Sequence, residues 1–567
     1  MPRKALYALS LSALALALAA CGGGGDASTA NTNGAVGTSY QDAAATATPI
    51  KHLVVIYGEN VSFDHYFATY PNATNPSGEP SFTAASGTPS VNGLSGSLLT
   101  ENPNFTNTTN GVNAANPFRL DRTQAATADQ GHNYTPEQQA YDNGAADLFP
   151  TYTGSATSGG AGAFGTKGQV MGYFDGNTVT GLWNLAQHYA LNDNAYTDTY
   201  GPSTPGALEV VSGQTNGFKI VLTSKQPFTL AASSYYINDG QGGYTMINDV
   251  DPAYDVCSST TDTGMMTGKN IGDLLNAAGL TWGGFMGGFN LSLTNSNGTT
   301  GCKRSTTSSI TNVTETDYIQ HHNWFQYFAS TSNPQHLRPS STARIGYSTQ
   351  ADGVTADPAN HQYDINDFFT AVKAGNYPSV AFLKAPAYQD AHAGYSDPLD
   401  EQAFVAEVVN FLQQQSDWSS TAVIVTYDDS DGWYDHQYAT PTSSSFDSQA
   451  DQLNGSGVCG SGTQQNGVGG SPVNGRCGPG TRIPFLLISP WAKVNYVDNT
   501  QISQASVTRF IEDNWLGGQR LGGGSFDAKA GSIMNMFNFS GSGNNPVVYI
   551  DPNTGERLST APSTSGT

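Results

Sequence analysis

The stretch His52-Leu53-Val54-Val55-Ile56-Tyr57-Gly58-Glu59-Asn60 decides the fold that we expect for this sequence. Its apolar run is typical of a strand buried on both faces, and the polar Glu59-Asn60 pair follows at the end. A second run, Thr421-Ala422-Val423-Ile424-Val425-Thr426-Tyr427, ends in Asp428-Asp429 in the same way. In open α/β sheets ligands bind outside the carboxyl ends of the strands, and oxygen-rich side chains there suit a hard divalent cation. The two stretches therefore predict a metal-dependent hydrolase.

Strand-like and helical patterns alternate along the rest of the chain. Two more apolar runs end at Lys384 and Ser489, and a helix is expected with Asp397 as its N-cap and Pro398 at its first position. Further helical patterns begin near three apolar residues, Ile271, Ile365 and Val507. This alternation predicts a mostly parallel central sheet covered by helices on both faces. Stretches rich in Gly, Asn and Ser are expected to form long surface loops, at residues 83–111, 154–168 and 443–480.

The N-terminus has the pattern of an export signal. A short basic region, Met1-Pro2-Arg3-Lys4, precedes an apolar stretch that ends at Leu18-Ala19-Ala20-Cys21, which resembles the bacterial lipoprotein cleavage box. We expect a signal peptide over 1–20, a flexible tether over 21–48 after a lipidated Cys21, one catalytic domain over 49–540 and a polar tail over 541–567. The protein would then be lipid-anchored in the outer membrane or periplasm of a bacterial envelope, or secreted. An ordinary signal peptide followed by a chance cysteine is the alternative.

The other four cysteines, Cys257, Cys302, Cys459 and Cys477, are an even number in a compartment that we expect to be oxidising. Three pairings are open, and we favour the sequence-local one, Cys257–Cys302 with Cys459–Cys477. A structural zinc site is excluded because no two cysteines have its close spacing.

Net charge limits the partners of the chain. The formal charge is -23, with 45 acidic and 22 basic residues, which disfavours binding to nucleic acid or to anionic membrane surfaces. An anionic substrate would need local positive charge at its site, and a metal ion supplies it.

Glu59-Asn60 continues as Val61-Ser62-Phe63-Asp64-His65-Tyr66-Phe67, which resembles the E-N-x-S-F-D-H-Y-F signature of the bacterial phosphoesterase family. That family contains the phosphatidylcholine-type phospholipases C and the acid phosphatases of the Francisella type. Four more blocks follow in the family's order: Gly131-His132-Asn133-Tyr134, Tyr200-Gly201-Pro202-Ser203, His321-His322-Asn323-Trp324-Phe325, and the ten residues from Tyr427 to His436. The resemblance covers roughly residues 50–540 and implies an alkaline-phosphatase-like α/β/α sandwich.

The resemblance also implies roles for the site residues. Ser203 would be the nucleophile, at a helix start where backbone N–H groups and the helix dipole favour bound phosphate. Capping of the helix is the simpler role for Ser203, and Thr204 is the neighbouring candidate nucleophile. One divalent metal ion, whose identity stays open, would be held by five residues: Glu59, Asn60, Ser203, Asp428 and Asp429.

Three histidines, His132, His322 and His392, are expected to complete the site as proton donors or phosphate-binding cations. His321 is adjacent to His322 and is an alternative to it. His65 and His436 lie inside motifs, where a structural hydrogen bond is the simpler role. No role is assigned to the remaining four histidines, His52, His188, His336 and His361.

Two blocks bear on the substrate. Residues 385–397 resemble the acid phosphatases, and Asp428-Asp429 departs from the glutamate-asparagine pair usual in the phospholipases. We therefore expect an exported, metal-dependent acid phosphatase that hydrolyses phosphate monoesters through a covalent phosphoserine. The first alternative is a phospholipase C, and the second is a non-catalytic surface lipoprotein. A sulfatase is disfavoured because Ala207 stands where the sulfatase branch of this fold requires arginine.

Overall fold

The computed structural model describes residues 43–222 and 228–563, which belong to one compact unit, residues 39–567. The expected signal peptide, the lipidated Cys21 and most of the tether lie outside the described residues. Within the described part of the chain, no helix has both the length and the apolar character needed to cross a membrane.

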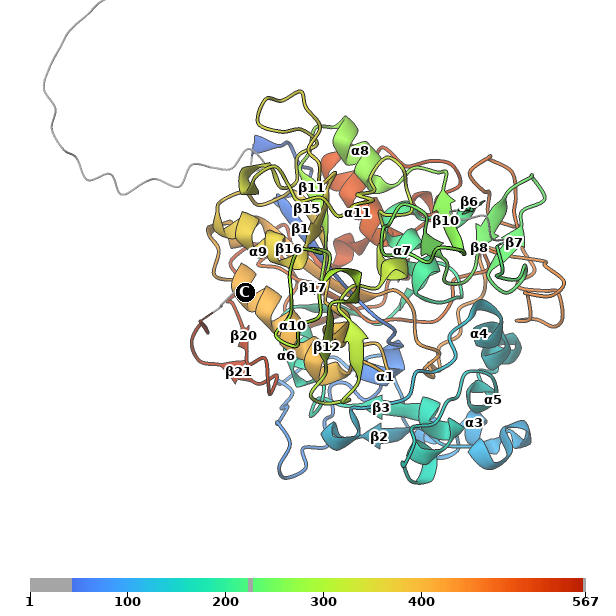
Figure 1. Ribbon diagram of the computed structural model, residues 1–567. Coiled ribbons are helices and arrows are strands. Elements are labelled where there is room, and N and C mark those ends of the chain that lie inside the picture. Colours follow the sequence, from blue (N-terminus) through green and yellow to red (C-terminus); the bar gives the residue numbers. More distant parts are fainter. Residues whose placement is uncertain (1–42, 223–227, 564–567) are drawn as a thin grey trace, which may run out of the picture. The chain divides into compact units, whose positions relative to one another are not determined.

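An eight-stranded sheet forms the middle layer of the fold (Figure 1). Its order is β14 (Gln362–Asp364), β11 (Trp282–Met286), β15 (Val380–Lys384), β1 (His52–Gly58), β16 (Thr421–Tyr427), β17 (Phe485–Ile488), β4 (Ala190–Asn192) and β18 (Tyr496–Asp498). All neighbouring pairs are parallel except the two that involve β17. The prediction of a mostly parallel central sheet is confirmed.

Helices cover both faces of this sheet. Figure 1 shows three on one side, α6 (Thr180–His188), α9 (Ile365–Lys373) and α10 (Pro398–Leu412). On the other side lie α7 (Ser203–Ser212), α8 (Ile271–Ala277) and α11 (Ala505–Trp515). Asp397 caps α10 by accepting hydrogen bonds from the N–H groups of Leu399 and Asp400, with Pro398 at the first position, as predicted. Because both faces are covered, the central strands are buried along their whole length, which explains their continuous apolar runs.

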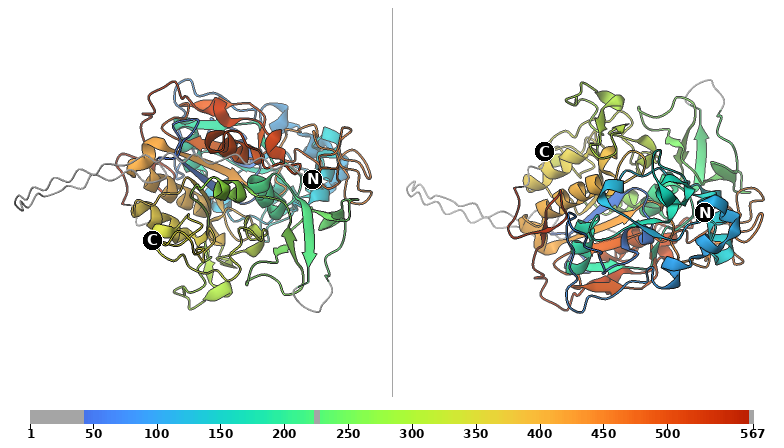
Figure 2. Two further views of the ribbon diagram at one scale, coloured as in Figure 1. Left: turned by 90° about the horizontal axis from the view of Figure 1, so that it is seen from above. Right: turned by 90° about the horizontal axis from the view of Figure 1, so that it is seen from below.

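A second, five-stranded sheet was not predicted from the sequence. It has the order β7 (Tyr236–Asn238), β8 (Tyr244–Met246), β6 (Asn216–Val221), β10 (Thr263–Met266) and β9 (Asp251–Pro252). Figure 2 shows this sheet, in green, extending from one side of the central layers. Its strands are only two to six residues long, so their sequence carries little alternating pattern.

Two expectations about the C-terminal half are corrected. The region after residue 540, expected to be a tail without elements, contains the hairpin of β20 (Tyr549–Ile550) and β21 (Arg557–Leu558). Asn410 of α10 exchanges two hydrogen bonds with the backbone of Ile550, and Gln413, the C-cap of α10, exchanges two with the backbone of Val548, as a neighbouring strand would. Residues 443–480, expected to be a surface loop, also include a buried part around the disulfide Cys459–Cys477. Both predicted disulfides, Cys257–Cys302 and Cys459–Cys477, are present.

Candidate active site

Four predicted metal ligands meet at the carboxyl ends of two neighbouring strands. β1 and β16 are paired in parallel with Gly58 opposite Tyr427, so Glu59-Asn60 and Asp428-Asp429 leave the sheet side by side. All four side chains are buried. Carboxylate oxygens of Glu59, Asp428 and Asp429 lie within 4.8 Å of one another. The expectation that the strand ends bring these residues together is confirmed.

Ser203 joins this group from the start of α7. Its Oγ donates to Glu59 Oε2 at 2.9 Å and lies 3.4 Å from both Asn60 Oδ1 and Asp429 Oδ2. The N-cap position of α7 is Pro202, and no side chain caps the helix. The Ser203 hydroxyl is therefore directed at the carboxylates and does not cap the helix. The Thr204 hydroxyl instead donates to the backbone oxygen of His321 at 3.1 Å, away from this group.

Gly206 lets α7 lie directly against the end of β16. A Cβ at this position would be 2.0 Å from the backbone oxygen of Asp428, which no side chain can tolerate. The phenol of Tyr57 in β1 also donates to the backbone oxygen of Gly206 at 2.8 Å. These contacts fix the first turn of α7 relative to both strands, and with it Ser203.

The surroundings of the Asn60 amide test whether these residues fit a cation. One end of the amide lies 2.7 Å from Glu59 Oε2, 2.9 Å from Asp428 Oδ1 and 3.1 Å from Asp429 Oδ2. The other end lies 3.1 Å from His392 Nε2, and His392 Nδ1 already donates to the backbone oxygen of Ala393 at 2.6 Å. The inner end of the Asn60 amide thus contacts all three carboxylates, where the amide nitrogen can donate to them and where the amide oxygen would face an ion bound among them.

Three buried carboxylates this close to one another need a positive charge among them. Burial and the neighbouring Glu59 raise the pKa of Asp428 to about 8, which is the penalty for placing these carboxylates together without a bound ion. The donors from Glu59, Asn60, Ser203, Asp428 and Asp429 are all oxygens, as a hard divalent ion requires. The residues present fit the predicted metal.

His132 and His392 lie on the open side of this group. His132 Nε2 is 3.4 Å from the outer end of the Asn60 amide, and its Nδ1 is 3.0 Å from Asp431 Oδ1. Burial lowers the pKa of His132, but Asp429 and Asp431 raise it more, so the net pKa lies well above the usual value. The rings of His132 and His392 pack edge to face with centroids 5.8 Å apart.

His322, and not His321, faces the carboxylates. His322 Nδ1 lies 3.0 Å from Glu59 Oε1, and its side chain is buried. Burial, together with His321 and Lys384, holds the pKa of His322 well below its usual value, so its imidazole is neutral. The ring of His321 is 30% exposed and lies 3.8 Å from Asp251. The structure thus separates these two adjacent candidates.

An open depression of about 710 Å³ leads to these groups. His132, His321, His322 and His392 line it together with three carboxylates, Asp129, Asp249 and Glu315, and two tyrosines, Tyr235 and Tyr395. Among the described residues that line it there is no lysine or arginine. The four histidines without an assigned role do not line it either.

Lys384 is a site residue that the sequence analysis missed. It ends β15 next to β1, is fully buried, and forms ion pairs with Glu59 Oε1 and with Asp428 Oδ2, the latter at 3.4 Å. The sequence does contain a signal for this role, because Lys384 is a single charged residue at the end of an otherwise apolar strand.

His65 and His436 have structural surroundings. His65 Nδ1 donates to the backbone oxygen of Gly172 at 2.8 Å, and its ring stacks on Trp433. His436 Nδ1 lies 2.6 Å from Asp64 Oδ2, within an ion-pair network that also contains the buried Arg482. Neither histidine lines the depression.

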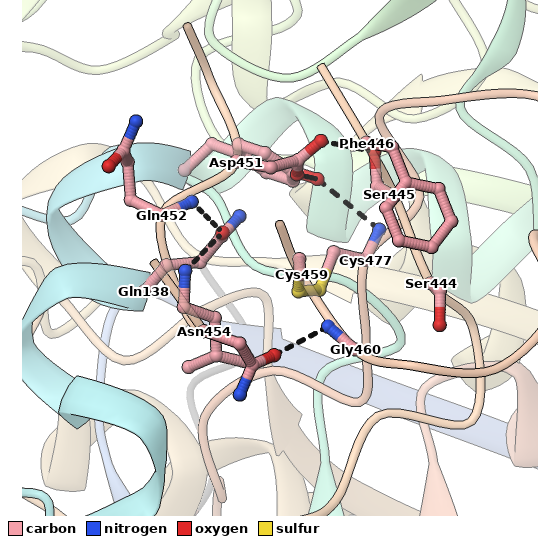
Figure 3. The surroundings of a disulfide bond; sticks show 12 residues. Gln138, Ser444, Ser445, Phe446, Asp451, Gln452, Asn454, Cys459, Gly460 and Cys477 are labelled. Atoms are coloured by element: carbon pink, nitrogen blue, oxygen red, sulfur yellow. Dashed lines mark hydrogen bonds between the residues drawn. A yellow bond between two sulfur atoms is a disulfide. The ribbon is translucent and has the colours of Figure 1, made fainter. Parts of the chain in front are cut away.

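The segment around the disulfide Cys459–Cys477, drawn in Figure 3, contacts the parts of the chain that carry His132 and Ser203. Tyr134 begins α4 (Tyr134–Tyr141), two residues after His132, and its hydroxyl donates to Asp451 Oδ1 at 2.7 Å. In the same helix Gln138 accepts hydrogen bonds from the backbone N–H groups of Gln452, labelled in Figure 3, and Leu453. The backbone oxygen of Cys477 accepts from the N–H of Tyr200, three residues before Ser203. This segment therefore contacts the loops that carry both His132 and Ser203.

The sequence profile of the Phosphoesterase family matches residues 50–516, which include every site residue described above. The chain belongs to this family. The resemblance seen in the motif blocks is thereby confirmed.

Curated relatives are named phospholipases C. The non-hemolytic phospholipase C of Burkholderia pseudomallei is 23% identical over 481 residues, covering 82% of this chain and 55% of that protein. The hemolytic phospholipase C of Pseudomonas aeruginosa is 22% identical, covering 88% and 58%, and phospholipase C A of Mycobacterium tuberculosis is 22% identical, covering 79% and 69%. The chain spans little more than half the length of the first two. These names agree with the interpretation of the chain as a phosphoric ester hydrolase.

Proposed function

We propose that this protein is an exported, metal-dependent phosphoester hydrolase with an alkaline-phosphatase-like fold and Ser203 as its nucleophile. The observation that carries the proposal is the position of Ser203 Oγ, 2.9 Å from Glu59 Oε2 at the start of α7 and beside the ends of β1 and β16. A serine used only as a helix cap would not be directed at buried carboxylates.

The residues suit a two-step displacement. A divalent ion held by Glu59, Asn60, Ser203, Asp428 and Asp429 would lower the pKa of the serine and offset the charge of the phosphate. Ser203 Oγ gives its proton to solvent and attacks phosphorus, the bond to the leaving oxygen breaks, and that oxygen takes a proton from a site histidine. Water then gives a proton to that histidine and attacks the phosphoserine, the bond between phosphorus and Oγ breaks, and Ser203 takes a proton back from solvent. His132, with its raised pKa, suits the role of the cation that binds phosphate oxygens.

Two substrate classes remain in the proposal. Residues 385–397 favour a phosphomonoesterase, whereas the names of the relatives favour a phospholipase C at least as strongly. The rim of the depression gives an independent criterion. Because it carries Asp129, Asp249 and Glu315 and no lysine or arginine among its described residues, it favours a neutral or cationic alcohol part over a further anionic group.

A substrate panel tests this proposal. The purified protein would be assayed with p-nitrophenyl phosphate, p-nitrophenylphosphorylcholine and phosphatidylcholine vesicles, with and without chelator. We expect hydrolysis of at least one substrate, its loss with chelator, and a fall of at least about a thousandfold in Ser203→Ala. Thr204→Ala is the matched control and should keep most of the rate. Activity that persists in Ser203→Ala would refute the nucleophile, and inactivity on all substrates with added divalent ions would favour the non-catalytic alternative.

Export and lipid anchoring are proposed from the sequence of residues 1–21. Cys21→Ser should release the protein from the membrane fraction, because the lipid-bearing thiol is lost. Unchanged membrane association of this variant would rule out the lipoprotein proposal.

A further inference from the structure

In each of the three carboxylates at the site, one oxygen is held by a protein donor other than Asn60 and Ser203. Lys384 contacts Glu59 Oε1, which also lies 3.0 Å from His322 Nδ1. The same Lys384 Nζ donates to Asp428 Oδ2 at 3.4 Å. Asp429 Oδ1 accepts from the N–H of Asp431 at 2.6 Å.

The second oxygens face one another around Asn60 and Ser203. Glu59 Oε2 and Asp428 Oδ1 lie 2.7 Å and 2.9 Å from the inner end of the Asn60 amide, and Asp429 Oδ2 lies 3.4 Å from Ser203 Oγ. Because Lys384 reaches from β15 across β1 to Asp428, one buried ammonium group restrains two carboxylates that stand on different strands. Lys384 thereby engages one oxygen of Glu59 and one oxygen of Asp428, and the other oxygen of each carboxylate faces Asn60. Asp428 Oδ1 also accepts from the backbone N–H groups of Asn60 and Asp429, at 3.2 Å and 2.9 Å, which hold it in that direction.

We propose that Lys384 is a positioning residue that determines which divalent ion the site accepts, by keeping Glu59 and Asp428 monodentate. This inference rests on the proposed metal site and deepens it. Ca²⁺ takes six to eight oxygens and commonly binds carboxylates through both oxygens, whereas Mg²⁺ and similar small ions prefer compact octahedral shells of single oxygens. Single oxygens from Glu59, Asn60, Ser203, Asp428 and Asp429 leave room for a phosphate oxygen in such a shell. Lys384 also offsets one of the three negative charges, which leaves a charge that matches a divalent ion.

The test measures ion binding and does not depend on activity. Chelator-treated protein, checked for folding by circular dichroism, would be titrated calorimetrically with Mn²⁺ and separately with Ca²⁺. We expect wild-type protein to prefer Mn²⁺, and the ratio of the Ca²⁺ Kd to the Mn²⁺ Kd to fall at least about tenfold in Lys384→Met, because Glu59 and Asp428 become free to bind through both oxygens. Lys51→Met is the matched control, since Lys51 precedes β1 and Glu59 follows it, so the two residues lie at opposite ends of this strand. This control loses the same charge and should keep the wild-type ratio.

The outcomes separate this inference from the proposed function. If the wild-type protein binds neither ion, the metal site fails and the role of Lys384 with it. If the wild-type protein binds both ions and Lys384→Met changes the two Kd values by the same factor, only the role of Lys384 fails. If Lys384→Met does not fold, X-ray absorption fine structure of Mn²⁺-loaded wild-type protein decides. Single-oxygen carboxylate ligation supports the proposal, and two-oxygen ligation overturns it.

Discussion

Glu59 and Asp428 follow two hydrogen-bonded neighbouring strands of the central sheet. His132 and His392 stand on loops, and His322 ends a short 3₁₀ helix, η8 (Gln320–His322), in three distant parts of the chain. The strand-end residues inherit their positions from the register of β1 and β16. The loop histidines are held by side-chain and backbone contacts, such as that of His132 with Asp431 and that of His392 with the backbone of Ala393. The site therefore has a strand-end half, with Glu59 and Asp428, and a loop half, with His132, His322 and His392. We expect that substitutions in the strand-end half cause loss of the ion, whereas substitutions in the loop half remove or misplace an imidazole and leave the ion bound.

The largest effect is expected at the strand ends. Asp429→Asn removes a charged ligand while keeping the side-chain shape, so we predict loss of the bound ion and a fall in kcat/KM of at least about a thousandfold. Metal content by atomic emission and steady-state kinetics would be measured on the same sample. Full metal content in Asp429→Asn would contradict the assignment of Asp429 as a metal ligand.

A smaller effect is expected from the loop half. His322→Ala should lower kcat about a hundredfold, because one positioned imidazole is lost, while the metal content stays at the wild-type level. His321→Ala is the matched control, since its ring lies at the exposed rim, and should change kcat little. Loss of metal in His322→Ala would show that the two halves are not separable.

A third prediction concerns what supports the loops. Replacing both Cys459 and Cys477 with Ser should lower the free energy of unfolding by about 3 kcal/mol, as expected for a crosslink over 18 residues. It should also lower kcat about tenfold with metal retained, because α4 and the loop before Ser203 lose their support. Denaturant unfolding and kinetics at low temperature would measure the two effects.

Cys257→Ser with Cys302→Ser is the control for this pair. The disulfide Cys257–Cys302 contacts the segment of His322 through a hydrogen bond from the Gln320 side chain to the backbone oxygen of Cys257. Because this acceptor is a backbone atom, the contact can persist without the disulfide, and we expect a smaller loss of kcat. Equal losses in the two double variants would indicate general destabilisation and no specific support of the site.

The smallest effect concerns a histidine outside both halves. Burial lowers the pKa of His436, but Asp64 raises it more, and the net pKa lies above the usual value. The pair therefore contributes its full stability below the unfolded histidine pKa of ~6.5 and loses it as pH rises through the raised folded pKa. At the acid end, the lowered pKa of Asp64 means that the contribution is lost as pH falls through that value.

His436→Asn should accordingly cost about 1 kcal/mol near pH 6 and less at higher pH, with kcat unchanged. Denaturant unfolding at several pH values measures the difference from wild type. A cost that grows with pH would contradict the sign, and a large loss of kcat would place His436 in the site.

The strand-end half could be predicted from the sequence because continuous apolar runs and the polar residues after them are local features. The four strands, the start of α10 and the convergence of Glu59 with Asp428 all follow from this pattern. The loop half required motif resemblance, since nothing in the spacing of His132, His322 and His392 brings them together. Lys384 was missed because its partners are fixed only by strand order, with β15 beside β1. The hairpin of β20 and β21 was missed because its partner is a pair of amide side chains on a helix.

The contact of Asn410 with Ile550 spans 140 residues of the chain. At synthesis rates of about 5–20 residues per second, α10 would wait roughly 7 to 28 s after its own emergence before the hairpin could pair with it. Through that interval, Asn410 and Gln413 present unpaired amides to whatever surrounds the growing polypeptide. A translation pause after α10 would lengthen the interval in which these two amides have no partner on the last hairpin.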